Sequence, residues 1–514
     1  MDKQWTGIFL EEIEDFKNTI NAFDKGEIER KPYKGISGGL GSYAQRNPSR
    51  HMLRLRLGGG RLTLERLKFL AEIVEREQVG RIKLTTCETV QLHDLSAAQV
   101  PLIMEEAIGC GIYTKGGGGD NPRNVMASPL SGVQVGEAFD VIPWAEAVTR
   151  YLLSVCRDIH MPRKLKIAFC NGVDDCVHSA FRDMGFLAQP DGTFALRIAG
   201  GLGAVRPSMG LLVEEHVRPQ EVLYYVRAMI DVFSAHGNYD NRAKARTRFL
   251  QDTLGCDGLR EAFTKQVESL KMAGGLELSG LEKTEIMKQA DDNPIGHARA
   301  IPQKQSGLYA VKYHPIGGML PVEKPRQLYE LLKDMEGAEI RIAPDESLYI
   351  INLNSAEAKK VLAVTDDGAQ TEFEHSVACI GAATCQQGVR DSQSVLRSIV
   401  KAVQEAGIAD GALPKICISG CPSSCGTHQT GAIGFQGGVK KVDSSSCPAF
   451  KMSLGGSDRL GEARFGEGSV AILERDMPAL LVELGKVVQA SGQRWEEWSK
   501  SHPQELEDII AKYI

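Results

Sequence analysis

The sequence predicts an α+β protein with an internal duplication, and three observations support this fold class. First, Gly59–Leu92 aligns with Gly317–Ile350 without a gap, at a constant offset of 258 residues. Second, each copy shows strand-like alternation, then a helical stripe, then further alternation. Third, the long segments that follow the copies share a similar run, PRKLKIAF at 162–169 and LPKICISG at 413–420. We therefore expect two related halves.

Each copy of the repeat is expected to form a half-domain of strands and one helix. The alternating runs MLRLRL and YAVKYH predict the first strand, and an apolar stripe after a glycine turn predicts the helix. The runs RIKLTT and TVQLHD, and EIRIAP and SLYIIN, predict the closing strands. Because charged and apolar residues alternate, one sheet face should be buried while the other presents Arg54, Arg56 and Lys83. A half-domain with one apolar face should pair with its duplicate.

The remaining segments complete a division of the chain into five parts. The first 40 residues are expected to form an amphipathic helix and an exposed loop. Linkers are expected around Lys283–Asn293 and at the Asp366–Gly368 turn. The five parts are an N-terminal helix and extension at 1–45, the first half-domain at 46–112, a larger domain at 113–290, the second half-domain at 300–368 and a second larger domain at 369–514.

The composition limits the classes of function. With 42% hydrophobic residues, a chain of 514 residues can bury several cores. The 60 basic and 66 acidic residues give a net charge of −6, which argues against nucleic acid as a partner. No apolar run is long enough to span a membrane and the N-terminus is unlike a signal peptide, so we expect a cytoplasmic protein without a membrane partner. Twelve cysteines are too few for a disulfide scaffold.

Two pairs of cysteines late in the chain have the spacing of metal ligands. Cys379 and Cys385 are separated by five residues, and Cys421 and Cys425 by three. Two short loops that each supply two thiolates can hold zinc or an iron–sulfur cluster, and the five-residue spacing favours the cluster. The alternative is that these are ordinary buried cysteines. Cys417 is a competing ligand, although it lies in an apolar run and is expected to be packed.

Several cationic residues lie where basic groups commonly meet an anion. Arg54, Lys164 and Lys166 alternate with apolar residues, which predicts that they project from one face of a strand. Arg123 follows the glycine run 116–119. The run NRAKARTRF at 241–249 can instead be the charged face of a helix. Together these cations suggest a polyanionic cofactor or a small oxyanion as ligand.

These residues resemble a known family, the siroheme and [4Fe–4S] sulfite and nitrite reductases. The resemblance covers about residues 40–500 and includes the repeat, both cysteine pairs, the RNV loop at 123–125, the PRKLK run at 162–166 and the GGLG turn at 200–203. It implies two ferredoxin-like half-domains that pair into one domain, together with two α/β domains that bind siroheme and a [4Fe–4S] cluster.

The resemblance also implies roles for individual residues. The cluster ligands are expected to be Cys379, Cys385, Cys421 and Cys425, with Cys425 also bridging to the siroheme iron. The substrate-binding cations are expected to be Arg54, Arg123, Lys164 and Lys166. Lys83 and Arg246 are expected to contact siroheme carboxylates. The chain departs from the family pattern at Cys87, where Arg is usual, and at Ser423, where Asn is usual, so some siroheme contacts should differ.

The implied reaction is the six-electron reduction of sulfite to sulfide, with the reduction of nitrite to ammonia as the alternative. Lys164 together with Lys166 and the GSYAQ stretch at 41–45 resemble the sulfite members. The stretch DNPRNVMASPLSG at 120–132 is instead closer to the ferredoxin-dependent nitrite members. Two Arg and two Lys suit either anion, because they neutralise it and can deliver protons.

An external protein is expected to donate the electrons. The chain has no flavin or nicotinamide motif, since GGLGAV at 200–205 lacks the strand and helix that flank a dinucleotide-binding turn. The donor is expected to be ferredoxin or a flavoprotein reductase subunit. A non-enzymatic alternative is an iron–sulfur electron carrier or a zinc-stabilised interaction module. That alternative explains the cysteines but gives the four cations no task.

Overall fold

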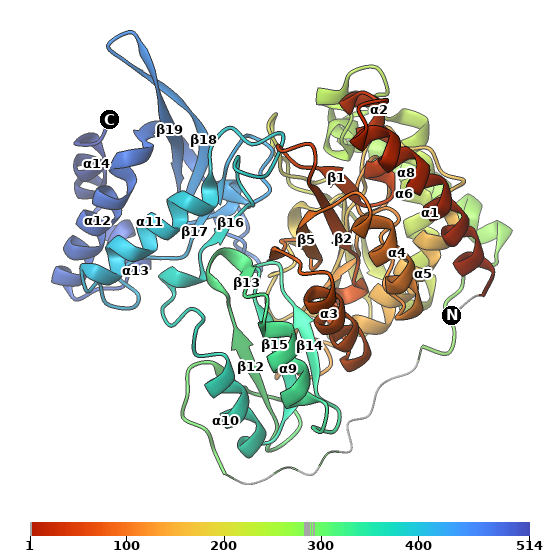
Figure 1. Cartoon of the computed structure of the whole chain (residues 1–514), viewed down its shortest axis with the longest axis horizontal. Coiled ribbons are helices and arrows are strands. Elements are labelled where there is room, and N and C mark those ends of the chain that lie inside the picture. Colours follow the sequence, from red (N-terminus) through yellow and green to blue (C-terminus); the bar gives the residue numbers. More distant parts are fainter. Residues whose placement is uncertain (1–2, 282–287, 289, 291–292) are drawn as a thin grey trace. The chain divides into compact units, whose positions relative to one another are not determined.

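The computed structural model describes residues 3–281, 288, 290 and 293–514 (Figure 1). The chain divides into two compact units. The first unit comprises residues 1–201, 205–313 and 320–366, and the second comprises residues 202–204, 314–319 and 367–514. Most of the linker expected around Lys283–Asn293 lies outside the described residues. The division into five parts stays a prediction, whereas the α+β class and the duplicated half-domains are confirmed.

Two five-stranded antiparallel sheets in the first unit correspond to the two copies of the repeat. The first sheet has the order β1 (Ser42–Ala44), β2 (His51–Leu55), β5 (Val90–Leu95), β4 (Arg81–Leu84) and β13 (Met319–Leu320). The second has the order β11 (Ala300–Pro302), β12 (Tyr309–Tyr313), β15 (Leu348–Leu353), β14 (Glu339–Ile342) and β3 (Arg61–Leu62). Each sheet is thus completed by a two-residue strand from the other copy. This exchange explains why the half-domains pair.

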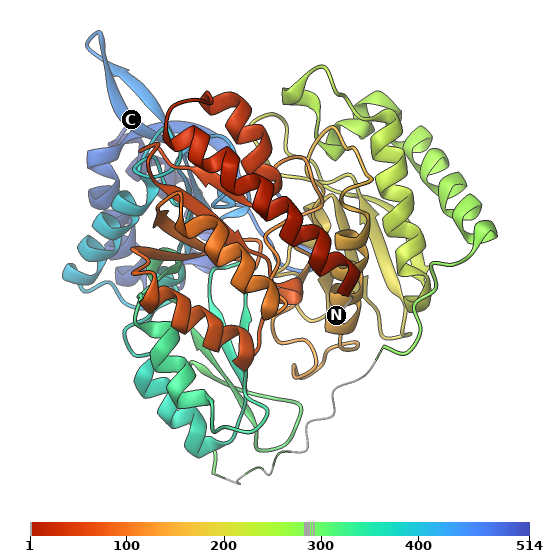
Figure 2. The same cartoon turned by 45° about the vertical axis from the view of Figure 1, so that its right-hand side comes forward.

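Helices cover the buried faces of these sheets. Helix α3 (Leu64–Arg76) begins at Thr63, whose hydroxyl accepts the backbone N–H of Arg66, and it packs against α9 (Lys324–Leu332) of the other copy. Helices α4 (Gln99–Gly109) and α10 (Ser355–Val364) follow the closing strands. Helix α1 (Lys3–Asp24) packs beside α4 (Figure 2). A single apolar core joins these elements, with Ile82 and its counterpart Ile340 both fully buried.

The N-terminal segment differs in part from the expectation. Helix α1 is amphipathic as predicted, because Phe9, Ile13 and Phe16 recur on one buried face. The expected exposed loop is instead helix α2 (Arg30–Gly39). Tyr33 of α2 is buried and stacks on Phe23 with 3.9 Å between ring centroids. This aromatic contact anchors a segment whose glycines and charges are typical of a loop.

A third sheet of the first unit is mixed. Its order is β10 (Leu211–Val217), β9 (Phe194–Ile198), β8 (Met184–Ala188), β7 (Ile167–Cys170) and β6 (Met126–Ala127). Strand β7 runs parallel to β6 and β8, and the remaining pairs are antiparallel. Its core includes helices α5 (Ile142–Val155), α6 (Val222–His236) and α8 (Gly255–Ala273).

The second unit contains a sheet of the same topology. Its order is β16 (Val377–Ala378), β17 (Ile416–Ser419), β18 (Ile433–Val442), β19 (Ser445–Leu454) and β20 (Glu467–Leu473). Here β17 is parallel to both neighbours, like β7, and the later pairs are antiparallel. Helices α11 (Ser392–Glu405), α12 (Met477–Ser491), α13 (Trp495–Ser501) and α14 (Pro503–Ala511) complete the unit. The two runs compared in the sequence, at 162–169 and 413–420, lead into equivalent strands.

None of the described helices is both long and apolar enough to cross a membrane.

Candidate functional site

Two of the predicted substrate-binding arginines meet at one backbone carbonyl. Arg54 lies on β2, and its Nη1 donates to the carbonyl oxygen of Gly117. Arg123 donates from Nη1 to the same oxygen at 3.0 Å and from Nη2 to the carbonyl of Gly119 at 2.8 Å. The glycine run therefore fixes both guanidinium groups side by side, as a cationic site requires.

The close packing of this glycine run explains its composition. A Cβ atom at Gly118 would lie 2.4 Å from the carbonyl oxygen of Gly38 and 2.5 Å from the hydroxyl of Tyr43. A Cβ atom at Gly117 would lie 2.8 Å from the carbonyl oxygen of Thr114. All three distances are shorter than carbon–oxygen packing allows, so only glycine fits at these two positions.

The loop that carries Arg123 runs beside the segment that carries the two predicted lysines. The backbone N–H of Arg123 donates to the carbonyl of Leu165 at 2.8 Å. Strand β7 begins only at Ile167, so the prediction that Lys164 and Lys166 lie within a strand is wrong. They flank Leu165, which forms a single parallel bridge with Pro122. The segment that carries the two lysines therefore forms a β-bridge with the Arg123 loop at Leu165 and does not continue it as a strand. Lys164 and Lys166 are both half-buried.

Asp183, which the sequence analysis did not single out, organises a second group of cations. Both oxygens of its fully buried carboxylate accept hydrogen bonds from Arg246 Nη2 at 3.0 Å. Its Oδ1 also accepts a hydrogen bond from the hydroxyl of Thr247. It also accepts the backbone N–H of Lys166 at 2.8 Å. The Asp183 carboxylate thereby links the predicted cofactor residue Arg246 to the Lys166 segment. A lone Asp in a strand-like run has no spacing that reveals this role.

Buried guanidinium groups in this region retain unused donors. Arg56 is 4% exposed, and its guanidinium donates to the carbonyls of Lys115 and Arg123 at 2.6 and 3.0 Å. The Nε–H groups of Arg56, Arg123 and Arg246 are buried without a hydrogen-bond partner. Burial lowers the pKa of Arg56 and Arg123 to about 10, which still leaves both charged at neutral pH. Unused donors on buried cations fit the binding of an anion.

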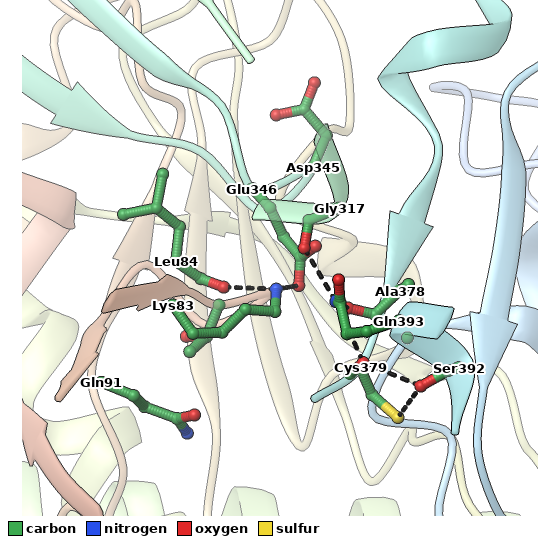
Figure 3. A network of polar contacts seen from close by, with 12 residues as sticks. Lys83, Leu84, Gln91, Gly317, Asp345, Glu346, Ala378, Cys379, Ser392 and Gln393 are labelled. Carbon is green, nitrogen blue, oxygen red and sulfur yellow. Dashed lines mark hydrogen bonds and ion pairs between the residues drawn. The ribbon is translucent and has the colours of Figure 1, made fainter. Parts of the chain in front are cut away.

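Lys83, predicted to contact a cofactor carboxylate, forms an ion pair within the protein. Its ammonium interacts with the carboxylate of Glu346 and donates to the carbonyl of Leu84 at 2.6 Å (Figure 3). The two side chains are 3% and 2% exposed. The expectation that the sheet face around Lys83 and Arg56 is open is therefore wrong. The pairing of the half-domains covers Lys83, and Arg56 bonds to backbone carbonyls.

Cys379 of the second unit lies in a polar environment at the end of β16. Its Sγ accepts the backbone N–H of Gly420 at 3.2 Å. The same sulfur lies 3.1 Å from the hydroxyl of Ser392 (Figure 3). The side-chain amide of Gln393 donates to the carbonyls of Gly317, Ala378 and Cys379 at 3.0, 3.0 and 3.1 Å. Burial raises the pKa of Cys379 to about 11. Backbone donors of this kind stabilise a thiolate once a metal binds it.

The other three cysteines lie near Cys379 in the same unit. Burial raises the pKa of Cys385, and the charges of Cys425 and Cys421 raise it further. Cys425 also raises the pKa of Cys379, and its side chain is exposed. In the described part of the chain, however, no three His, Cys, Asp or Glu side chains form a ready metal site. The mutual effects on pKa indicate that these cysteines are neighbours.

The loops around these thiols are shaped for close approach of backbone and sulfur. A Cβ atom at Gly426 would lie 2.1 Å from the carbonyl oxygen of Ile418 and 3.2 Å from the backbone nitrogen of Cys379. Ser424 adopts a left-handed conformation with φ of 55°, and its buried hydroxyl has no hydrogen-bond partner. Four neighbouring thiols, a glycine-lined approach and an unused buried donor fit an iron–sulfur cluster. Cys417 is 4% exposed within β17, packed as expected.

Family models match three segments of the chain. The model described as the nitrite and sulphite reductase 4Fe-4S domain matches residues 118–271. The model described as the nitrite/sulfite reductase ferredoxin-like half domain matches twice, at residues 43–108 and 301–366. The first match includes the cations around Arg123 and Lys166. It does not reach the four cysteines, whose role as ligands stays a prediction.

Similar proteins were found in bacteria and archaea. The chain is 27% identical to ferredoxin–nitrite reductase of Synechococcus elongatus over 459 residues, which covers 85% of this chain and 86% of the relative. It is 25% identical to the assimilatory ferredoxin-dependent nitrite reductase of Haloferax mediterranei, covering 90% and 83%. The solved structure of the NirA protein of Mycobacterium tuberculosis has a TM-score of 0.80 at 23% identity, covering 96% and 95%. That likeness shows a shared fold.

Proposed function

The chain belongs to the family of nitrite and sulfite reductases that use siroheme and a [4Fe–4S] cluster, and we propose that it reduces nitrite to ammonia with six electrons. The observation that carries the proposal is the cationic site around Gly117, where Arg54 and Arg123 are held side by side with unused donors nearby. The relatives support nitrite over sulfite, because those reported above with a named activity are nitrite reductases. This reverses the order of the two substrates expected from the sequence.

The residues of the second unit fit the cluster. We assign its four ligands to Cys379, Cys385, Cys421 and Cys425, and the exposed thiol of Cys425 suits the additional bridge to siroheme. When bound, the two cofactors supply single electrons to the substrate and an open coordination position for it. Arg246 is the better supported of the two predicted siroheme-binding residues, because its Nε–H is unused whereas Lys83 is paired with Glu346.

The cations of the first unit position the substrate and supply protons. The guanidinium groups of Arg54 and Arg123 neutralise the bound anion, and their fixed geometry keeps its oxygens oriented. The ammonium of Lys166 is a proton donor whose pKa is lowered, mainly by burial, which makes proton release easier. Lys164, two residues away in the same extended segment, is assigned the same task. Each N–O bond that breaks consumes protons, so two donors in one segment suit the reaction.

A ferredoxin is the proposed electron donor. The relatives from Synechococcus and Haloferax carry ferredoxin in their names. The six electrons must arrive singly, which suits a one-electron carrier. Sulfite is retained as a second candidate substrate because Lys164 and Lys166 together carry the two positive charges that a dianion requires.

Product stoichiometry tests the proposal. The holoprotein, with siroheme confirmed by its visible absorption, is supplied with nitrite and a known amount of reduced ferredoxin under anaerobic conditions. We expect one ammonia for every six ferredoxins oxidised, without accumulation of a partly reduced product. Failure to oxidise ferredoxin in the presence of nitrite, with siroheme and cluster present, would exclude the proposed function.

A further inference from the structure

Asn124 has a buried side chain that forms several hydrogen bonds directly beside Arg123. The residue is only 2% exposed. Its Oδ1 accepts the backbone N–H of Leu57 at 2.9 Å, and its Nδ2 donates to the carbonyl of Leu57 at 2.7 Å. The same Nδ2 donates to the carbonyls of Cys87 at 3.0 Å and Glu88 at 3.3 Å. The side-chain amide thus pairs with both backbone groups of Leu57, as a neighbouring strand would.

These bonds join three segments of the first unit. Leu57 lies two residues beyond the end of β2, the strand that carries Arg54. Cys87 lies in the turn between β4 and β5, and Asn124 itself belongs to the loop of Arg123. The bond to the turn uses the Cys87 carbonyl, so it does not depend on the side chain at this position, where Arg is usual in the family. The Asn124 amide therefore connects the two segments that carry the arginines.

The residues on either side of Asn124 bond to the same segment after β2. The guanidinium of Arg56 donates to the carbonyl of Arg123 at 3.0 Å. The backbone N–H of Gly59 donates to the carbonyl of Val125 at 2.9 Å. Three consecutive residues of the loop thus bond to residues 56–59, with Asn124 in the centre. The Asn124 amide is well placed to set the distance between the loop and β2.

We propose that Asn124 is a positioning residue of the anion site, whose amide fixes the separation of the guanidinium groups of Arg54 and Arg123 and thereby sets the affinity for nitrite. Asn124 acts through the two arginines, because its amide bonds to the backbone of the protein. Two guanidinium groups bind one small anion jointly only when their spacing matches it, so a displacement of about 1 Å weakens binding. This inference rests on the proposed function and names a residue on which the substrate affinity of that site depends.

The affinity of the holoprotein for nitrite gives a readout other than turnover. Nitrite is titrated into the oxidised holoprotein, and the change in siroheme absorption, normalised to siroheme content, gives Kd. In Asn124→Ala, both backbone groups of Leu57 lose their partner and the Arg123 loop can shift. We expect Kd to rise about tenfold, and KM to rise with it while kcat changes less.

A second substitution covers the case in which Asn124→Ala does not fold with siroheme. Asn124→Ser keeps a hydroxyl, which fills part of the space but is too short to bond to both backbone groups of Leu57. The same increase in Kd is expected in Asn124→Ser. An unchanged Kd in a substituted protein that retains siroheme would overturn the inference.

Asn171 provides the matched control. It is a fully buried asparagine of the same unit, and its amide donates to the side chains of Gln134 at 2.7 Å and Glu137 at 3.2 Å. Asn171→Ala should lower the free energy of unfolding about as much as Asn124→Ala, but it should leave Kd for nitrite unchanged. Equal increases in Kd in the two variants would show that lost stability, and not the position of the arginines, weakens binding.

A double-mutant cycle shows whether Asn124 acts through the arginines. In an Arg123→Lys background the paired guanidinium geometry is already lost, so adding Asn124→Ala should raise Kd only about twofold or less. A tenfold effect in both backgrounds would mean that Asn124 acts by another route, and would overturn the inference while leaving nitrite reduction intact. A wild-type holoprotein that neither binds nor reduces nitrite would instead overturn the proposed function and, with it, this inference.

Discussion

Arg54 and Arg123 donate hydrogen bonds to the same acceptor, the carbonyl oxygen of Gly117, although they lie 69 positions apart in the sequence. Two like charges that share one acceptor repel each other, and an anion bound beside them would offset this repulsion. The tightly packed glycine run holds the two guanidinium groups in place. Close packing therefore holds two cations together, as expected for a preorganised binding site.

Replacing Arg123 by Lys should weaken the reduction of nitrite while preserving charge. A lysine cannot donate to Gly117 and Gly119 at once and still face the substrate, so the geometry of the site is lost. We expect kcat/KM for nitrite to fall by roughly 10–100-fold. Arg163→Lys is the matched control, because Arg163 forms a half-buried ion pair with Asp120 and, among the described residues, does not bond to Gly117 or Gly119. Equal losses in the two variants would contradict the assignment of Arg123.

The ion pair of Lys83 with Glu346 joins β4 of the first copy to the turn between β14 and β15 of the second copy. Glu346→Gln leaves a buried ammonium without its counter-charge and should lower the free energy of unfolding by about 3–5 kcal/mol. The double variant Lys83→Met with Glu346→Leu should regain most of that stability in thermal or denaturant unfolding. If the double variant is as unstable as the single one, the unpaired ammonium is not the cause of the lower free energy of unfolding. Siroheme content, read from visible absorption, separately tests the predicted cofactor role of Lys83.

Cys425 and Cys417 are expected to behave oppositely when replaced by serine. Cys425→Ser should lose iron and acid-labile sulfide, because a cluster ligand is removed. Cys417→Ser should retain both, since the Cys417 sulfur is packed inside β17, where the hydroxyl of Thr427 donates to it at 3.8 Å. Loss of the cluster in Cys417→Ser, with retention in Cys421→Ser, would show that the ligand set is misassigned.

His51 is expected to make the first unit sensitive to acid. Burial lowers its pKa from 6.5 to about 4, and its Nδ1 lies 3.1 Å from the hydroxyl of Tyr33. The folded-state pKa is below the unfolded value, so the unfolded chain binds the proton more readily between pH 6.5 and 4. The stability that neutral, buried His51 contributes is therefore fully present above pH 6.5 and is lost as the pH falls towards 4. Between pH 7 and 5 this amounts to about 2 kcal/mol.

The substitution His51→Gln tests this pH dependence directly. Glutamine does not titrate and can still bond to Tyr33, so its unfolding free energy should vary less between pH 7 and 5 than that of wild type. Parallel plots of unfolding free energy against pH for wild type and variant would show that His51 does not contribute to the pH dependence.

Local patterns in the sequence predicted the half-domains well. The alternation of MLRLRL produced β2, and the capping residue Thr63 begins α3 where the apolar stripe starts. The exchange of β3 and β13 between the copies was not predictable, because a two-residue strand has no periodicity. It depends on the turn at Gly60, with φ of 66°, which brings the chain to the other sheet. The strand expected at Lys164 and Lys166 failed because Leu165 has only one bridging partner.

The sequence predicted which kinds of residue form the candidate site better than it predicted how they are arranged. Cysteine spacing identified two pairs of thiols, and the resemblance assigned the cations. Neither indicated Asp183, which lies far in sequence from the arginine it holds. The relatives with a named activity favour nitrite over the sulfite preference that was drawn from counting lysines.

The ratio of kcat/KM for nitrite to kcat/KM for sulfite, measured on wild-type holoprotein with reduced ferredoxin, tests the central claim most directly. Because the relatives reported above with a named activity are nitrite reductases, we predict a ratio well above one at neutral pH. A ratio below one, with siroheme and cluster fully present, would contradict the claim and identify sulfite as the substrate.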